Sequence, residues 1–227
     1  MIAYGVCVGS EEKYQACARP GLRACASPDA PVAECRDADS IFTAYNQVLD
    51  VFAEQPDLEA LVLLHEDVEL RDAHFEAKVR RALADDSVAV VGVIGARSVT
   101  SLAWWEGEGR GRCAETRGVI AFEGGGADVD VVDGLLLVLS PWAARNLRFD
   151  EAGFHGFHGY DADICFQARA AGRRVRVVDL DLFHHTKGGY GDLAAYQAAD
   201  VTFRSKWADA LGGGFCAPTQ AQAARTA

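Results

Sequence analysis

The chain has 227 residues, of which 50% are hydrophobic and 24% charged, and 33 acidic against 22 basic side chains give a formal net charge of −11. This length fits one domain, and the apolar content excludes a wholly disordered chain. The negative charge disfavours nucleic acid as a general partner, because it repels phosphate backbones. No apolar stretch approaches the ~18 residues that span a bilayer.

The cysteines and the N-terminal stretch indicate the cellular compartment in which the protein is expected. The seven cysteines contain no CxxC pair, so neither a zinc ribbon nor a redox pair is expected. The N-terminal stretch has no basic region and no long apolar run, unlike a signal peptide. We therefore expect free thiols and a cytoplasmic location.

Strands and helices alternate along the first half of the chain. We expect strands at residues 2–8, 58–64 and 88–94, and helices at residues 11–18, 41–53 and 73–84. The strands are near-continuous in apolar side chains, which is typical of parallel strands covered on both faces. Ser40 and Asp72 are the expected N-caps of the second and third helices, and residues 31–35 fit a short edge strand.

The second half opens with a long Gly- and charge-rich stretch at residues 97–127, which we expect to be a functional loop or to hold small strands of its own. Further strands are expected at residues 129–139 and 174–183. Helices are expected at 161–171 and 193–211, and a short helix is expected to start at Pro141-Trp142, near Arg145. We expect residues 1–211 to form a single domain and residues 212–227 to be a flexible tail.

This order predicts an α/β fold with an open, mostly parallel sheet and helices on both faces. In such sheets ligands bind beyond the carboxyl ends of the strands. That rule selects Gly9-Ser10, the segment 65–69, and His184-His185, because each follows a strand directly. We expect these clusters to meet at one edge.

Asp67 follows a buried strand and is surrounded by His65, Glu66 and Glu69. Carboxylate oxygens suit magnesium or manganese, and an imidazole from His184 or His185 would favour manganese. Adjacent residues of a strand point in opposite directions, so at most one of the two histidines is expected to be a metal ligand. The alternative is a solvated turn in which Asp67 or Glu69 caps backbone amides.

A second candidate region is the segment 153–160, rich in Gly, His and aromatic residues, followed by Asp161 and Asp163 at a helix start. A carboxylate there is stabilised as an anion by the helix dipole and could serve as a general base, although ordinary capping also explains both. Lys187 precedes two glycines that would let the backbone approach a diphosphate.

Taken in order, these motifs resemble the family 2-like glycosyltransferases of the GT-A fold, and specifically a small bacterial branch with His-x-Asp-Val in place of Asp-x-Asp. The similarity spans about residues 1–207. It is carried by LVLLHEDVEL, VDGLLLVLSP, GFHGYDADICFQARAAGRRV and the strand ending in FHH, with SIFTAYNQVL and FRSKW in support.

The resemblance implies a nucleotide-diphosphate sugar donor, with UDP favoured, and a divalent metal, manganese rather than magnesium. Asp67 corresponds to the metal-binding acid, and His65 stands where the first aspartate would be. His184 or His185 corresponds to the late metal-binding histidine. Asp161 corresponds to the general base of inverting members, and Tyr160 replaces the glutamate that precedes it.

The same resemblance implies the binding residues. Donor contacts are expected from Val8, Gly9, Ser10, Tyr45, Asn46, Glu66, Asp133, Gly134 and Lys187. Acceptor contacts are expected from Trp104, Trp105, His158 and Tyr160. The acceptor itself is unassigned; it is either small or bound with the help of a second subunit, so a homo-oligomer is compatible.

Two other functions fit parts of the pattern. A non-catalytic, degenerate transferase that binds a nucleotide-sugar or a protein is compatible with His65 and Tyr160, the two departures from the family pattern. A metal-dependent nucleotidyl or phosphoryl transferase would need a Gly-rich phosphate loop with a basic residue after the first strand. The acidic run Gly9-Ser10-Glu11-Glu12 there argues against it.

Overall fold

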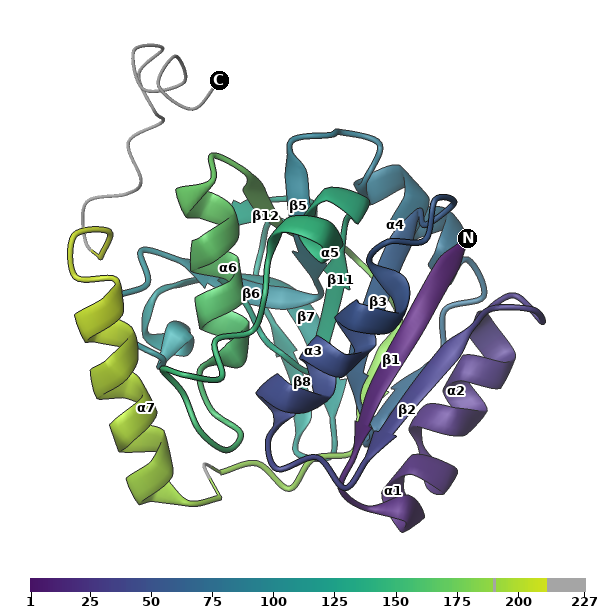
Figure 1. Ribbon diagram of the computed structural model, residues 1–227, viewed down its shortest axis with the longest axis horizontal. Coiled ribbons are helices and arrows are strands. Elements are labelled where there is room, and N and C mark those ends of the chain that lie inside the picture. The colour runs from purple at the N-terminus through teal and green to yellow at the C-terminus, as the bar shows by residue number, and fades with distance from the viewer. Residues whose placement is uncertain (190, 212–227) are drawn as a thin grey trace.

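The computed structural model describes residues 1–189 and 191–211, and the predicted flexible tail lies outside them. A seven-stranded sheet forms the centre of the molecule (Figure 1), in the order β2-β1-β3-β11-β5-β12-β9. Its strands are β1 (Ile2–Val8), β2 (Val32–Arg36), β3 (Ala60–His65), β5 (Val88–Gly92), β9 (Asp128–Val129), β11 (Leu136–Leu139) and β12 (Arg174–Val177).

The direction of β11 sets the geometry of the site. It runs antiparallel to both β3 and β5, while β1 is parallel to β2 and β3. The α/β class is confirmed, but the sheet is mixed rather than mostly parallel, because apolar runs report burial and not strand direction. Since β11 is reversed, the residues that precede it lie at the carboxyl edge of β3.

Helices cover both faces of this sheet, as expected. Successive residues of a strand point to opposite faces. On β1, the Tyr4 ring lies 6.3 Å from that of Phe75 in α4 (Phe75–Ala82), whereas a Cβ added to Gly5 would lie 2.5 Å from Val48 of α3 (Ile41–Phe52). In Figure 1, α5 (Pro141–Asn146) and α6 (Tyr160–Ala170) lie on the same side as α3.

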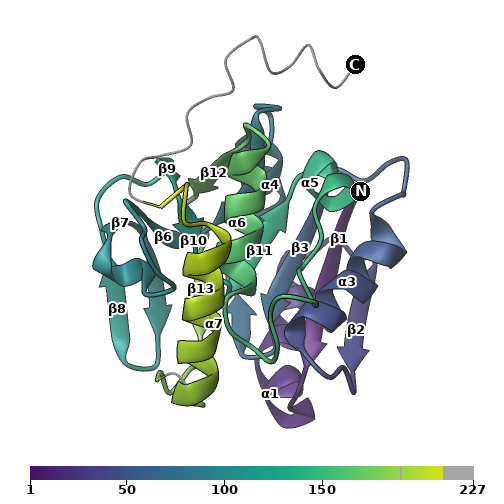
Figure 2. The ribbon, with the colours of Figure 1, turned by 60° about the vertical axis from the view of Figure 1, so that its left-hand side comes forward.

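A second sheet, in the order β10-β6-β7-β13-β4, lies beside the first (Figure 2). The long segment 97–127 does hold strands of its own, namely a β7–β8 hairpin that follows the short 3-10 helix Trp104–Glu106. The strands are β4 (Val68–Leu70), β6 (Ile94–Arg97), β7 (Glu108–Glu115), β8 (Gly118–Ala121), β10 (Val131–Val132) and β13 (Leu182–His184).

This second sheet explains why three predicted strands were too long. The segment predicted at 88–94 divides into β5 and β6, that at 129–139 into β9, β10 and β11, and that at 174–183 into β12 and β13. In each case the chain passes from one sheet to the other within a segment rich in apolar residues. Both sheets bury their strands, so hydrophobicity alone does not reveal the crossing.

Helix boundaries differ from the prediction near Asp72 and at the N-terminus. The Asp72 carboxylate accepts from the His74 amide at 2.9 Å, and the helix itself begins only at Phe75. The helix predicted at 11–18 ends earlier, as α1 (Glu11–Ala16), and a second helix that was not predicted, α2 (Ala18–Cys25), follows it. Ser40 caps α3 as expected, because its hydroxyl accepts from the Thr43 amide at 3.1 Å.

The last described helix, α7 (Leu193–Lys206), is shorter than expected and lies beside α6 in both views (Figures 1 and 2). The Phe166 and Phe203 rings join the two helices with centroids 4.9 Å apart. Within residues 1–189 and 191–211, no helix combines the length and the apolar character that a membrane span requires.

Candidate active site

Most of the predicted site residues meet in one cavity of ≈ 880 Å³. It lies beyond the carboxyl ends of β1 and β3, where the start of β11, the start of α6 and the end of β13 converge. The predicted residues that line it are Gly9, Glu66, Asp67, Trp104, Trp105, Asp133, His158, Tyr160, Asp161 and His184.

One cluster in this cavity has the make-up of a metal site. Ligand atoms of His65, Asp67 and His184 all lie within 4.8 Å of one another. His65 ends β3, Asp67 lies in the turn to β4, and His184 ends β13, which pairs with β4. Two imidazoles and a carboxylate suit manganese and other transition metals better than magnesium, which prefers oxygen ligands.

The structure distinguishes the two adjacent histidines. His184 Nε2 lies 3.3 Å from Asp67 Oδ1, whereas His185 Nε2 lies 2.9 Å from Glu69 Oε2, outside the cluster. Their opposite orientations follow from strand geometry. The same alternation explains His65, whose side chain joins that of Asp67 two residues later. From the sequence, His65 was interpreted only as a replacement for the first aspartate of the Asp-x-Asp motif. Its spacing of two residues from Asp67 could have indicated that the two side chains lie on the same side of the chain.

Charges around the cluster favour the ligand forms of its side chains. Burial raises the pKa of Asp67, but hydrogen bonds from His184 and from Lys13 Nζ, 3.1 Å from Oδ2, outweigh burial and hold this pKa well below its usual range. Burial, together with the neighbouring His184, lowers the pKa of His65 to about 4. At neutral pH Asp67 is therefore a carboxylate and His65 a neutral imidazole.

Glu66 faces the other side of the same turn and holds the first strand in place. Its Oε2 accepts from the amides of Gly9 at 2.5 Å and Ser10 at 2.6 Å. The Ser10 hydroxyl caps α1 by accepting from the Lys13 amide. Val8 is buried in the core and does not line the cavity.

Asp161 and Asp133 bring two carboxylates together opposite the metal cluster. Asp161 accepts from the Gly134 amide at 3.0 Å and from the Ala162 amide at 2.9 Å. Burial and the negative charge of Asp133 raise the pKa of Asp161 to about 7. A carboxylate with this pKa can accept a proton at neutral pH.

Asp163, which the sequence grouped with Asp161, points away from the cavity. Only 1% of it is exposed, and its carboxylate accepts from Gln167 Nε2 at 2.7 Å, Lys206 Nζ at 3.0 Å and Trp207 Nε1 at 2.8 Å. Asp163 therefore joins α6 to α7.

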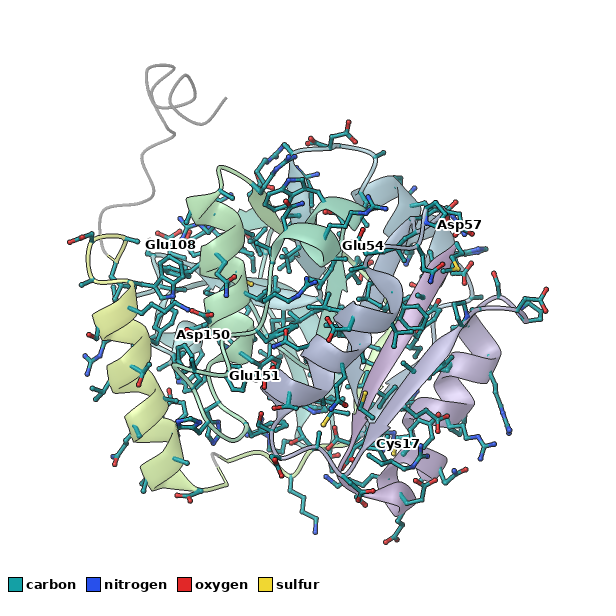
Figure 3. All side chains as sticks on the ribbon, viewed as in Figure 1. Cys17, Glu54, Asp57, Glu108, Asp150 and Glu151 are labelled. Carbon is teal, nitrogen blue, oxygen red and sulfur yellow. The ribbon has the colours of Figure 1, made fainter. Side chains whose placement is uncertain are left out.

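Like Val8, the predicted donor residues Tyr45, Asn46 and Lys187 do not line the cavity, and Ser10 and Gly134 adjoin lining residues without lining it themselves. Tyr45 is fully buried, with its ring 5.3 Å from that of Phe149. Asn46 donates to the Phe149 carbonyl at 2.8 Å and to Glu151, which is labelled in Figure 3, at 2.6 Å. Both side chains brace the loop that precedes α6. Lys187 is exposed on the segment after His184.

Four rings form an aromatic wall along one side of the cavity, and all four line it. The rings of Trp105 and Tyr196 stack with centroids 6.4 Å apart, and Tyr196 meets His158 edge-on at 5.5 Å. Phe157 continues the wall, 5.2 Å from the ring of His65. Phe157 is 51% exposed and Trp105 45% exposed, and exposed apolar surface gathered in one place is typical of a binding site. Phe157 belongs to the candidate segment 153–160, whereas sequence reasoning had missed Tyr196.

Comparison with known proteins identifies the family. The sequence profile described as "Glycosyltransferase like family" matches residues 3–202, nearly the whole described chain. The chain belongs to this glycosyltransferase-like family. Streptomycin biosynthesis protein StrF from Streptomyces griseus is 35% identical over 213 residues, which cover 92% of this chain and 75% of that protein. The sugar-transfer class expected from the sequence is thereby confirmed.

Solved structures share the fold at low sequence identity. A197 from STIV aligns with a TM-score of 0.55 and 14% identity, over 82% of this chain and 86% of its own. GalNAc-T7, crystallised with UDP, GalNAc and Mn2+, aligns with a TM-score of 0.56 and 10% identity, over 85% of this chain and 44% of its own. S. aureus TarS 1-349 aligns with a TM-score of 0.54 and 9% identity, over 81% of this chain and 60% of its own. These neighbours show that the glycosyltransferase has the GT-A fold.

Proposed function

We propose that this glycosyltransferase moves a sugar from a nucleotide-diphosphate donor to an acceptor hydroxyl, with inversion at the anomeric carbon. The observation that carries the proposal is the shared cavity, in which the cluster of His65, Asp67 and His184 and the carboxylate of Asp161 face one space. A metal site and a base in one cavity are the two parts that such a transfer requires.

The part of the cavity that holds the metal cluster would bind the diphosphate of the donor. His65, Asp67 and His184 would hold a divalent ion, and their nitrogen-rich donor set favours Mn²⁺ over Mg²⁺. When bound, the ion supplies positive charge for the diphosphate leaving group. GalNAc-T7, which shares the fold, was crystallised with UDP and Mn2+, and this supports a UDP-sugar as the donor.

Donor contacts would come from the rim of the same cavity. Gly9 and Ser10 form the turn after β1, and Glu66, from the turn after β3, accepts from both of their amides. Asp133 and Gly134 precede β11. Lys187 would approach the diphosphate from the segment that follows His184. Val8, Tyr45 and Asn46 would act from behind the cavity, by holding the elements that line it.

Asp161 would act as the general base. Its raised pKa lets it take the proton from the acceptor hydroxyl as the hydroxyl oxygen attacks the anomeric carbon. The diphosphate departs from the opposite face of the sugar, so the anomeric configuration inverts.

The acceptor would bind against the aromatic wall of Trp105, Phe157, His158 and Tyr196, with Trp104 and Tyr160 beside it. Exposed aromatic faces in a cavity are suited to the apolar faces of sugar-like rings. The relative StrF is named for streptomycin biosynthesis, and by analogy we propose a small-molecule acceptor.

The first test is a thermal-shift screen of the full chain against nucleoside diphosphates, with and without Mn²⁺. A ligand that binds only the folded state raises the melting temperature, so we expect a manganese-dependent shift with UDP. Asp67→Asn should abolish this shift, while Arg23→Met, an exposed change on α2, should leave it unchanged.

The base is tested with the donor identified in that screen. Asp161→Asn should lower turnover by about 10²–10⁴-fold while donor binding persists, because general-base catalysis contributes about this factor. Unchanged turnover would remove Asp161 from the mechanism. Donor binding without turnover in the wild-type chain, across acceptors, would favour the non-catalytic binding function instead.

A further inference from the structure

The side chains of His65 and Tyr160, 95 positions apart in the sequence, are joined by a hydrogen bond between His65 Nε2 and the Tyr160 hydroxyl. His65 ends β3 and Tyr160 begins α6, so the bond crosses the floor of the cavity from the metal cluster to the helix that carries Asp161.

The Tyr160 ring is held rigidly where it is. It is only 3% exposed, and it meets Phe42 at 6.2 Å, Tyr45 at 5.7 Å and Phe149 at 6.3 Å between ring centroids. A ring confined on several sides presents its hydroxyl at one point, so its partner is oriented by it.

The backbone makes room for this hydroxyl at Gly134. A Cβ added to Gly134 would lie 2.1 Å from the Tyr160 hydroxyl oxygen and 2.4 Å from its ring carbon Cζ. Any side chain at position 134 would therefore displace the tyrosine. Glycine at 134 and tyrosine at 160 together place one hydroxyl on His65.

We propose that Tyr160 is a positioning residue for His65 as a metal ligand, an inference that rests on the proposed metal site. A metal-binding imidazole is neutral: one nitrogen binds the metal, and the other carries the proton and donates it to an oriented acceptor. With Nε2–H donating to the Tyr160 oxygen, His65 is held in the tautomer whose Nδ1 is the ligand nitrogen.

The test is a double-mutant cycle with Mn²⁺ affinity as the readout, measured on the full chain by electron paramagnetic resonance of free Mn²⁺. Tyr160→Phe should weaken Mn²⁺ binding about 10–100-fold, the usual cost of removing such a partner. In a His65→Asp background the same change should have almost no effect, because aspartate has no ring tautomer to fix.

Tyr45→Phe is the matched control. Its hydroxyl is also buried in the same group of rings and, among the described residues, has no hydrogen-bond partner. We expect unchanged Mn²⁺ affinity in Tyr45→Phe. An equal loss of affinity in Tyr160→Phe with either His or Asp at position 65 would show a merely structural role and overturn the proposal.

A second measurement needs no variant. With the wild-type chain loaded with diamagnetic Cd²⁺, ¹⁵N spectra of the histidine rings should show Nδ1 of His65 bound to the metal and Nε2 protonated. Metal on Nε2 would overturn the positioning role while leaving the metal site intact. A wild-type chain that binds neither ion would overturn the metal site itself, and the inference with it.

Discussion

The Gly134 amide donates a hydrogen bond to Asp161 Oδ2 at 3.0 Å and thereby links the segment before β11 to the first turn of α6. The neighbouring residue, Asp133, contributes its negative charge to the same place. One short turn thus orients the proposed base and makes it harder to ionise. The pKa of about 7 is the result of these opposed effects, because burial and Asp133 raise it while the two amide hydrogen bonds lower it.

The pH dependence of turnover follows from that pKa. Asp161 must be deprotonated to act as a base, so kcat/KM should rise with pH and level off above an inflection near 7. Asp133→Asn removes a neighbouring negative charge and should move this inflection to lower pH. The check is a pH profile of kcat/KM for both proteins; an inflection that stays in place would exclude Asp133 as its cause.

The same group makes stability depend on pH. The pKa of Asp161 is about 7 in the folded chain against a reference of 3.8, so the folded state holds the extra proton. The free energy of unfolding therefore falls as pH rises from about 4 to 7. Asp161→Asn has no carboxyl to ionise at this position. Its free energy of unfolding should therefore rise by ~2 kcal/mol relative to that of the wild type between pH 5 and pH 8.

Urea denaturation of the metal-free proteins at the two pH values measures this gain. Because both proteins share every other titrating group, the difference between them isolates Asp161. Parallel pH profiles would mean that Asp161 ionises in the folded chain as readily as in the unfolded one.

We expect Lys13 to compete with the proposed metal ion for Asp67. Its ammonium lies 3.1 Å from Asp67 Oδ2 and 4.0 Å from Glu66 Oε1, in the space next to the cluster. Lys13→Met should therefore strengthen Mn²⁺ binding by a few-fold, an effect that shrinks in high salt because the lysine is half exposed. Titration of Mn²⁺ at two salt concentrations measures it, with Arg23→Met as control. Weaker binding in Lys13→Met would contradict the competition.

The junction of α6 and α7 depends on a buried charge. Lys206→Met would leave the Asp163 carboxylate, which is 1% exposed, without its cation, and should cost about 2–4 kcal/mol of unfolding free energy. Arg204→Met breaks a pair with Asp200, one turn of α7 apart, in which the arginine is 56% exposed, and should change stability by less than ~0.5 kcal/mol. Urea denaturation compares the two; equal losses would place the effect in the helix itself.

Local signals in the sequence determined a large part of the structure. Ser40 caps α3 because the capping hydrogen bond lies within four residues. The family motifs added Asp161, which does line the cavity. Each of these features depends on neighbours along the chain, and a pattern of residues is enough to reveal it.

The tertiary structure decided what depends on residues far apart in the sequence. The direction of β11 is set by its partners β3 and β5, and it brings Gly134 to Asp161. Asp163 lies two residues from Asp161 in α6 and so points to another face of that helix. Only the folded chain shows that α7 covers this face and supplies Lys206 and Trp207 as partners of Asp163. His65 was identified as a metal-cluster residue held by Tyr160 only from the folded chain, because a hydrogen bond across 95 positions leaves no local pattern.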